Sequence, residues 1–209
     1  MAELRIISHP IAQDCLGLLR DKNTQTQVFR ETVRRLSRVL AVYACENLAI
    51  EPLRVETPLM TCDCASLARP SLALVSILRA GNGMVDGFLD LCPHAAVGFV
   101  GLERDEKTFK AREYYCKLPA QLAQRDCLVL DPMLATGGSA CDAIALLKAQ
   151  GAQKITFISL LAAPEGVQRL QAEHPDVTIL TAALDQGLNE LCYILPGLGD
   201  AGDRIFGTN

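Results

Sequence analysis

The chain of 209 residues has no apolar run long enough to cross a lipid bilayer, and its first residues lack the apolar core of a signal peptide. It also lacks an excess of basic residues: it has 20 lysines and arginines, 24 acidic residues and a net charge of −4. A basic surface is the usual mark of nucleic-acid binding. We therefore expect a cytoplasmic globular protein that binds neither membranes nor nucleic acid.

A cluster of metal-ligating side chains is also missing from the sequence. The chain has three histidines and nine cysteines, and the closest cysteine pair is Cys62 and Cys64. No histidine or further cysteine beside them completes a tetrahedral site, so we interpret them as two thiols at a strand end. An odd number of cysteines without a secretory signal favours reduced thiols over a disulfide framework.

Apolar strands and helical periods alternate along most of the chain, and half of the residues are hydrophobic. This alternation predicts a single α/β domain over residues 1–209, with a mostly parallel sheet and helices on both faces. Such sheets bind ligands at the carboxyl ends of their strands, near the point where the strand order reverses. We expect strands at 72–78, 95–102, 127–131, 154–162 and 177–184, and helices at 24–46, 84–91, 139–150 and 165–173.

The helix at 24–46 carries four arginines, Arg30, Arg34, Arg35 and Arg38, away from its apolar positions. These side chains could bind an anion or an effector. A solvated helix face or a contact between subunits is the simpler interpretation.

Two segments depart from the alternation of strands and helices. Residues 103–119 are charged and have no clear period, which predicts a long loop or hairpin that acts as a mobile lid. Residues 185–209 hold five glycines and a proline, a composition often found in disordered tails. This tail also contains Ile194, Ile205 and further apolar residues, so we expect it to pack against the body.

The stretch at 129–140, VLDPMLATGGSA, ends an expected strand and begins an expected helix. Its two glycines let backbone amides approach a ligand closely, and the free N–H groups at a helix start attract anions. Thr136 and Ser139 add hydroxyl donors, and Asp131 can accept hydrogen bonds from sugar hydroxyls. The pattern predicts a cradle for a phosphate monoester, although a simple helix cap uses the same residue types.

A second candidate anion site follows the strand at 72–78. Arg79 stands directly after that strand, and a guanidinium can bind a diphosphate through two N–H donors. The glycines after it are spaced too widely for a dinucleotide fingerprint, and 131–139 lacks the lysine of a Walker loop. The charged segment adds Arg104 and Lys107. Together these residues predict a ligand with a monophosphate at one end and a diphosphate at the other.

The segment 131–139, DPMLATGGS, resembles the phosphoribosyl-pyrophosphate (PRPP) loop of type I phosphoribosyltransferases, in the form found in the uracil phosphoribosyltransferase family. The resemblance extends in the family's order over 77–87, 162–166, 174–177, 185–190 and 193–208, and YILPGLGDAGDRIFGT is the most specific block. It implies the type I phosphoribosyltransferase fold, a mostly parallel twisted sheet flanked by helices. It also implies a mobile lid and a glycine-rich C-terminal segment that binds the base. Asn82 and the segment 108–113 depart from the family pattern.

The resemblance implies a role for each motif. Uracil would be bound by Ile194, Gly199, Asp200 and Ala201, largely through backbone groups that distinguish it from cytosine. Catalytic roles would fall to Arg79, Arg104, Asp131 and Asp200. Mg²⁺ would be held mainly by PRPP and water, with Asp200 as a further ligand. PRPP would be bound by Arg79, Arg104, Asp200 and the loop residues Asp131, Pro132, Met133, Leu134, Ala135, Thr136, Gly137, Gly138 and Ser139.

The implied reaction is attack of uracil N1 on C1′ of PRPP, which gives UMP and diphosphate and belongs to pyrimidine salvage. No general base stands out, so positioning and stabilisation of the leaving diphosphate would do most of the catalysis. Two alternatives stay open: a weakly catalytic, nucleotide-sensing homologue, and a phosphoribosyltransferase for another base. The resemblance also implies a homodimer or larger homo-oligomer, with GTP as a candidate allosteric effector.

Overall fold

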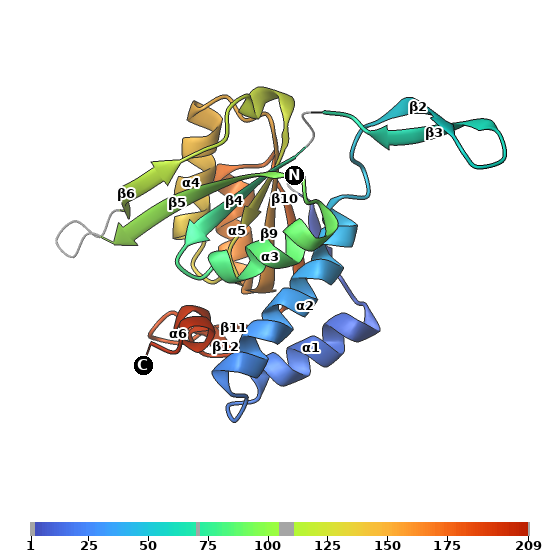
Figure 1. Ribbon diagram of the computed structural model, residues 1–209. Coiled ribbons are helices and arrows are strands. Elements are labelled where there is room, and N and C mark those ends of the chain that lie inside the picture. The colour runs from blue at the N-terminus through green and yellow to red at the C-terminus, as the bar shows by residue number, and fades with distance from the viewer. Residues whose placement is uncertain (1–2, 70–71, 105–110, 209) are drawn as a thin grey trace.

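Eight strands form the central sheet of the structure (Figure 1), a computed structural model that describes residues 3–69, 72–104 and 111–208. The side chains at 103–104 and 111–113 lie outside this description. Every pairing in the sheet is parallel except that of the edge strand β6. The order across the sheet is β1 (Leu4–Ile6), β10 (Thr178–Leu184), β9 (Lys154–Ala162), β7 (Asp126–Leu130), β4 (Leu72–Leu78), β5 (Ala96–Arg104) and β6 (Ala111–Lys117), and β8 (Met133–Leu134) pairs with β9.

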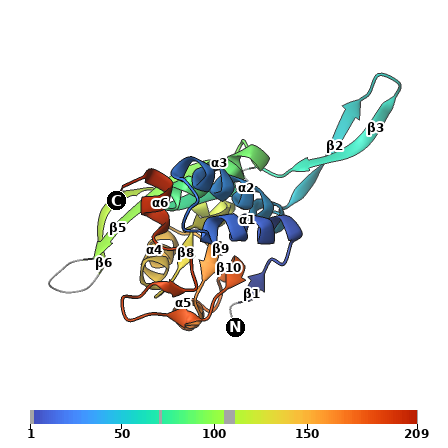
Figure 2. The ribbon, with the colours of Figure 1, turned by 90° about the horizontal axis from the view of Figure 1, so that it is seen from below.

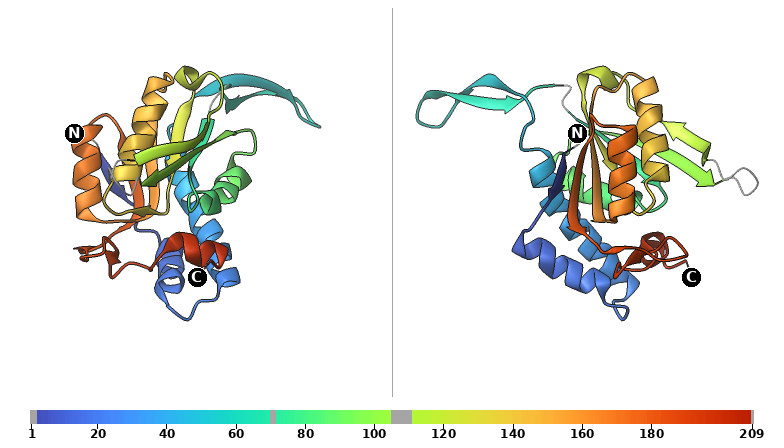
Figure 3. Two further views of the ribbon diagram at one scale, coloured as in Figure 1. Left: turned by 90° about the vertical axis from the view of Figure 1, so that its left-hand side faces the viewer. Right: turned by 180° about the vertical axis from the view of Figure 1, so that it is seen from behind.

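Helices cover both faces of the sheet (Figure 3), and this explains why the central strands are continuous apolar runs. On one face α2 (Thr26–Ala44) and α3 (Asn82–Leu91) bury side chains such as Phe29 and Phe88, and α1 (Pro10–Arg20) packs against α2. On the other face α4 (Gly138–Ala149) and α5 (Pro164–Glu173) enclose a second core around Phe157. A short 3-10 helix at Leu122–Gln124 precedes β7.

The arginines of α2 make contacts within the chain. Arg34 and Arg38 both pair with Asp90 of α3, at 2.6 Å each, and together they hold the pKa of that carboxyl down to about 2. Arg35 pairs with Asp14 of α1 at 3.0 Å, and Arg30 donates to the backbone oxygen of Ile205 at 3.0 Å. The arginine-rich face of α2 therefore ties the helix to its neighbours.

A two-stranded arm projects from the body between α2 and β4 (Figures 1 and 2). It consists of β2 (Ile50–Glu56) and β3 (Thr61–Leu67), which pair antiparallel over their full length. The arm ends in a turn whose Leu59 is 95% exposed and whose Met60 is 69% exposed. Cys62 and Cys64 lie within β3, with their Sγ atoms 3.7 Å apart, so our placement of them at a strand end is wrong. The arm was not predicted, because its strands lack the continuous apolar run of the buried ones.

The C-terminal segment lies beside α2, beyond the carboxyl edge of the sheet (Figures 1 and 3). It contains a small hairpin of β11 (Gly187–Leu188) and β12 (Ile194–Leu195), followed by α6 (Ala201–Phe206). Ile194 and Ile205 are buried, so the tail packs against the body as expected, whereas Leu191 and Tyr193 are exposed.

The sequence-based boundaries of the central elements agree with the structure to within about two residues, whereas β1 and α1 were not predicted. Residues 103–104 continue β5 and 111–117 form β6, so the described parts of the charged segment form a hairpin. Lys107 falls outside the described residues. Among the described helices, none has both the length and the apolar character that spanning a bilayer requires.

Candidate active site

The carboxyl ends of β4 and β7 lie side by side at the centre of the sheet. The two strands are hydrogen-bonded neighbours, and the chain continues from β4 to β5 on one side and from β7 to β9 on the other. The strand order therefore reverses between them, which is where open α/β sheets bind ligands. Because Arg79 follows β4 and Asp131 follows β7, the structure brings these two predicted residues to adjacent strand ends.

The loop 131–139 connects β7 to α4 and packs against the start of α5. Gly137, the N-cap of α4, has a left-handed φ of 78°, and an added Cβ would lie 3.0 Å from the backbone oxygen of Gly166. A residue with a side chain would be strained there. With glycine as the N-cap, no side-chain capping bond occupies the amides in the first turn of α4. The loop therefore presents free backbone N–H groups in the way that an anion site requires.

Asp131 has a perturbed carboxyl group at the start of this loop. Burial raises the pKa of Asp131 to about 7, and a hydrogen bond from the backbone N–H of Met133 opposes the rise. The carboxyl is enclosed by protein, although the residue as a whole keeps some contact with solvent. A buried carboxyl at a strand end is a functional candidate, because desolvation of this kind is typical of active sites.

A cavity of about 280 Å³ lies between the loop 131–139 and the C-terminal segment. The four residues expected to bind uracil, Ile194, Gly199, Asp200 and Ala201, all line it. Met133 and Ala135 of the loop also line it, so two motifs far apart in the sequence share one cavity. The remaining lining residues are Leu191, Cys192 and Tyr193.

Asp200 is held in a defined orientation at the edge of this cavity. It is the N-cap of α6, and its Oδ1 accepts a hydrogen bond from the backbone N–H of Asp203 at 2.8 Å. The same helix contacts Arg79, whose guanidinium lies 3.5 Å from the carboxylate of Asp203 and 6.0 Å from the ring centre of Phe206. Arg79 is 60% exposed and is thus accessible to a ligand. Arg104 ends β5, and its side chain lies outside the described part of the chain.

Sequence reasoning missed several residues around the cavity. Arg169 of α5 places a guanidinium nitrogen 3.3 Å from the position that a Cβ on Gly138 would take, while its Nε pairs with Glu173 at 2.8 Å. It therefore adds positive charge beside the loop, and no sequence pattern marks it. Tyr193 begins the matched C-terminal block and Cys192 directly precedes it. Their place beside that block is the sequence feature that could have marked them as cavity residues.

Among the residues that the structure describes, one group of three side chains has the composition of a metal site. Ligand atoms of Cys141, Glu173 and His174 lie within 4.8 Å of one another. Both ring nitrogens of His174 already have partners, however: Nε2 lies 3.0 Å from the backbone oxygen of Cys141, and Nδ1 lies 3.2 Å from Nζ of Lys148. We therefore interpret the group as a structural contact between α4 and α5.

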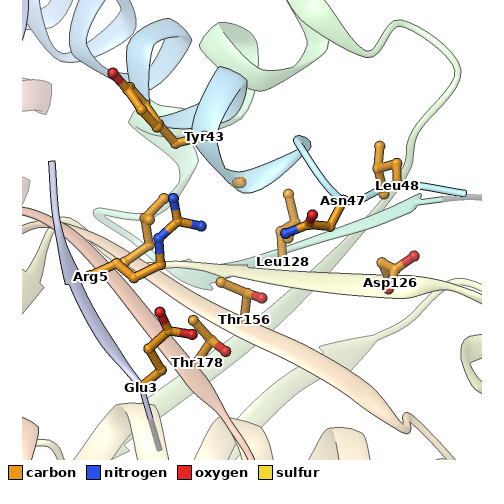
Figure 4. Close-up of a pocket in the computed structure, with 11 residues that line it drawn as sticks. Glu3, Arg5, Tyr43, Asn47, Leu48, Asp126, Leu128, Thr156 and Thr178 are labelled. Atoms are coloured by element: carbon orange, nitrogen blue, oxygen red, sulfur yellow. The ribbon is translucent and has the colours of Figure 1, made fainter. Parts of the chain in front are cut away.

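A second hollow, of about 150 Å³, lies at the amino ends of the strands (Figure 4). Glu3, Arg5, Asn47 and Thr156 are among its lining residues, and Arg5 pairs with Glu46 near its rim. The strand order directs ligands to the opposite edge of the sheet. We assign this hollow no part in the chemistry.

The family model for uracil phosphoribosyltransferase matches residues 6–208. The chain belongs to the uracil phosphoribosyltransferase family. Proteins named uracil phosphoribosyltransferase from Clostridium perfringens and Paracoccus denitrificans are 51% and 52% identical to it, over 208 and 207 residues. These alignments cover 100% of both chains in the first case, and 99% of this chain and 98% of the relative in the second.

Solved structures support the fold. The AQ2163 protein of Aquifex aeolicus superimposes with a TM-score of 0.93 at 33% identity, over 99% of both chains. A hypoxanthine-guanine phosphoribosyltransferase of Bacillus anthracis shares 11% identity and a TM-score of 0.51, over 77% of this chain and 80% of that one. The fold is thus that of the type I phosphoribosyltransferases, with a mostly parallel sheet and helices on both faces, as the resemblance implied.

Proposed function

We propose that this protein transfers the phosphoribosyl group of PRPP to N1 of uracil and releases diphosphate and UMP. The cavity shared by the loop 131–139 and the C-terminal segment carries the proposal. Its volume of about 280 Å³ is near the lower end of the roughly 300–1,000 Å³ of small-molecule sites, as a small base requires. Membership of the uracil phosphoribosyltransferase family supports this substrate pair.

In this proposal each end of PRPP binds one of the two anion sites. The 5-phosphate accepts hydrogen bonds from the amides and hydroxyls of 131–139, with the helix dipole of α4 behind them. The diphosphate binds Arg79 and Arg104, at the ends of β4 and β5. The carboxylates of Asp131, which follows β7, and of Asp200, which lines the cavity, accept hydrogen bonds from the ribose hydroxyls.

Uracil binds in the cavity against backbone groups of Ile194 and of Gly199–Ala201. A peptide N–H donates to a uracil carbonyl and a peptide oxygen accepts from N3–H, so the main chain can match the whole polar edge of the base. Cytosine presents an amino group and an unprotonated N3 instead. Buried groups left without partners in this way discriminate by up to about 10⁴-fold or more.

The donor set of the site suits Mg²⁺, which PRPP and water would mainly hold, because the carboxylate of Asp200 supplies a further hard oxygen ligand of the kind that this ion prefers. When bound, Mg²⁺ neutralises charge on the diphosphate. The two arginines stabilise the negative charge that grows on the same group as the C1′–O bond breaks. Positive charge develops on the ribose, where the carboxylates of Asp131 and Asp200 stabilise it. The hairpin of β5 and β6 closes over PRPP and excludes water, which competes with uracil as the nucleophile.

Incubation of the protein with uracil, PRPP and Mg²⁺, with UMP and diphosphate measured by chromatography, tests the proposal. We expect UMP with uracil, none with cytosine or hypoxanthine, and loss of activity when the metal is chelated. Absence of UMP, with and without added GTP, would refute the enzyme and leave the nucleotide-sensing homologue. Calorimetric binding of PRPP or UMP without turnover would then identify that homologue. A response of the measured rate to GTP would establish the effector that the resemblance implies.

We also propose that the protein is a homodimer and that the arm of β2 and β3 lies in the contact. An isolated two-stranded ribbon is marginally stable in water, and this one exposes Leu59, Met60 and Ile50. The arginines of α2 already have partners within the chain, so the arm is the better candidate contact. Light scattering should show a dimer for the wild type and a shift towards monomer for Leu59→Glu. A monomeric wild type would overturn this assignment.

A further inference from the structure

Two arginines connect the end of α1 and the C-terminal segment in opposite directions. Arg204 of α6 donates to the backbone oxygens of Leu19, Leu198 and Asp21, and its guanidinium lies 4.2 Å from the ring centre of Phe29. Arg20, the last residue of α1, points the other way and contacts the turn at 195–197. The end of α1 therefore supports the C-terminal segment, which lines the cavity proposed for uracil (called the base cavity below).

Arg20 reaches that turn together with Asp185, which follows β10. The two side chains form a forked ion pair, with Nη2–Oδ1 and Nη1–Oδ2 distances of 2.6 and 2.8 Å. The Asp185 side chain is only 5% exposed, so water screens this pair weakly. Neither residue lines the base cavity.

Both backbone polar groups of Gly197 are bound by this pair. The N–H of Gly197 donates to Asp185 Oδ2 at 2.9 Å, and its oxygen accepts from Arg20 Nη1 at 2.9 Å. We call the arrangement of Arg20, Asp185 and Gly197 the turn clamp. Gly197 has a φ of 62°, and an added Cβ would lie 2.1 Å from the oxygen of Ile194. The turn is therefore tight, and the clamp fixes it through one buried carboxylate and one guanidinium.

The position of the clamped turn matters because it stands between the base-binding residues. Ile194 comes three residues before Gly197, and Gly199 comes two residues after it. A rotation of the turn would move the backbone groups of both. The loop 131–139 is held by different contacts, with β9 and α5, so a change in the clamp leaves it in place.

We propose that Arg20 and Asp185 are positioning residues for base recognition, which act through the turn clamp and without touching uracil. The inference rests on the proposed function, because it assigns uracil to the cavity beside the turn. It predicts a loss that falls mainly on one substrate. The clamp variants bind uracil poorly, whereas PRPP keeps its phosphate contacts with the loop 131–139 and Arg79, and Asp200 keeps its hydrogen bond from Asp203 N–H.

The test measures kcat and the KM of each substrate for the wild type, Arg20→Ala, Arg20→Lys and Asp185→Asn. We expect Arg20→Ala and Asp185→Asn to raise the KM of uracil at least tenfold, since small misplacements cost up to about 100-fold. The KM of PRPP should change less than twofold. Arg20→Lys keeps the charge and loses the fork, so it should fall between Arg20→Ala and the wild type. Arg35→Ala, which breaks the exposed pair with Asp14, is the matched control and should resemble the wild type.

The outcomes separate the clamp from the proposed function. An inactive wild type refutes the function itself. An active wild type with an unchanged KM of uracil in Arg20→Ala and Asp185→Asn refutes the clamp. Equal increases in both KM values, with a lowered melting temperature, show a merely structural pair and also refute it. Where Arg20→Ala does not fold, the milder Arg20→Lys and Asp185→Asn give the answer by the same criterion.

Discussion

The buried carboxyl of Asp131 predicts that the active site costs the protein stability, and that this cost depends on pH. Its pKa rises from 3.8 to about 7 on folding, because the carboxylate loses solvent. The folded protein therefore holds this proton more tightly than the unfolded chain does. The contribution of Asp131 to the free energy of unfolding is most favourable below about pH 4, and it is lost as the pH rises to about 7 and above.

The size of the effect follows from the shift. A shift of about three pKa units, at 1.36 kcal/mol each, lowers the free energy of unfolding by about 4 kcal/mol between pH 4 and pH 8. Because Asp131 keeps some solvent contact, we expect roughly half of that, ~2 kcal/mol. Asp131→Asn should be more stable than the wild type at pH 8, and the two should converge near pH 4. The replacement has no charge to bury, and its side-chain oxygen still accepts the Met133 N–H.

Urea unfolding of both proteins at pH 4, 6 and 8, monitored by circular dichroism, measures this difference. The comparison with Asp131→Asn cancels every other titrating group, since only residue 131 differs. A stability difference that stays the same from pH 4 to pH 8 would contradict the argument, as would a variant that is less stable at pH 8. We also expect the variant to lose at least tenfold in kcat/KM for PRPP, because activity and stability conflict at this residue.

Three further predictions concern the PRPP side of the site. Arg79→Ala should raise the KM of PRPP at least tenfold and leave the KM of uracil within twofold, and an equal effect on both substrates would contradict its assignment to the diphosphate. Gly137→Ala should lower the free energy of unfolding by about 1–2 kcal/mol and weaken PRPP binding in calorimetry, because a side chain is strained at the left-handed φ of 78°. Arg169→Ala should weaken PRPP binding about two- to fivefold at low salt and less at high salt, since its guanidinium lies beside Gly138 and acts through its charge. A salt-independent loss would show that Arg169 acts through packing instead.

The central elements could be predicted well from the sequence because the pattern of apolar side chains in each element matches its burial. The run LALVSIL became β4 with the same boundaries, since helices cover both faces of that strand. The arm was missed because a ribbon without a core needs no apolar run, so β2 and β3 resemble loop sequence. The loop 131–139 was found from its glycines, whose role is local. Arg20 and Arg169 were not found, because each acts through a fold contact that leaves no pattern in neighbouring residues. Asp185 lies in the matched block 185–190, but the block alone does not reveal its ion pair with Arg20.

The connection between Arg204 and α1 sets the order in which the protein can be completed during synthesis. The backbone oxygens of Leu19 and Asp21 accept hydrogen bonds from Arg204, which comes 185 and 183 residues later in the chain. At about 5–20 residues per second, a ribosome needs roughly 10–40 s to make that stretch. Until then the backbone oxygens at the end of α1 lack the hydrogen bonds from Arg204, and the cavity lacks the residues of the C-terminal segment that line it. A nascent chain that contains the whole sheet but has not yet reached residues 194–204 therefore lacks one side of the cavity proposed for uracil.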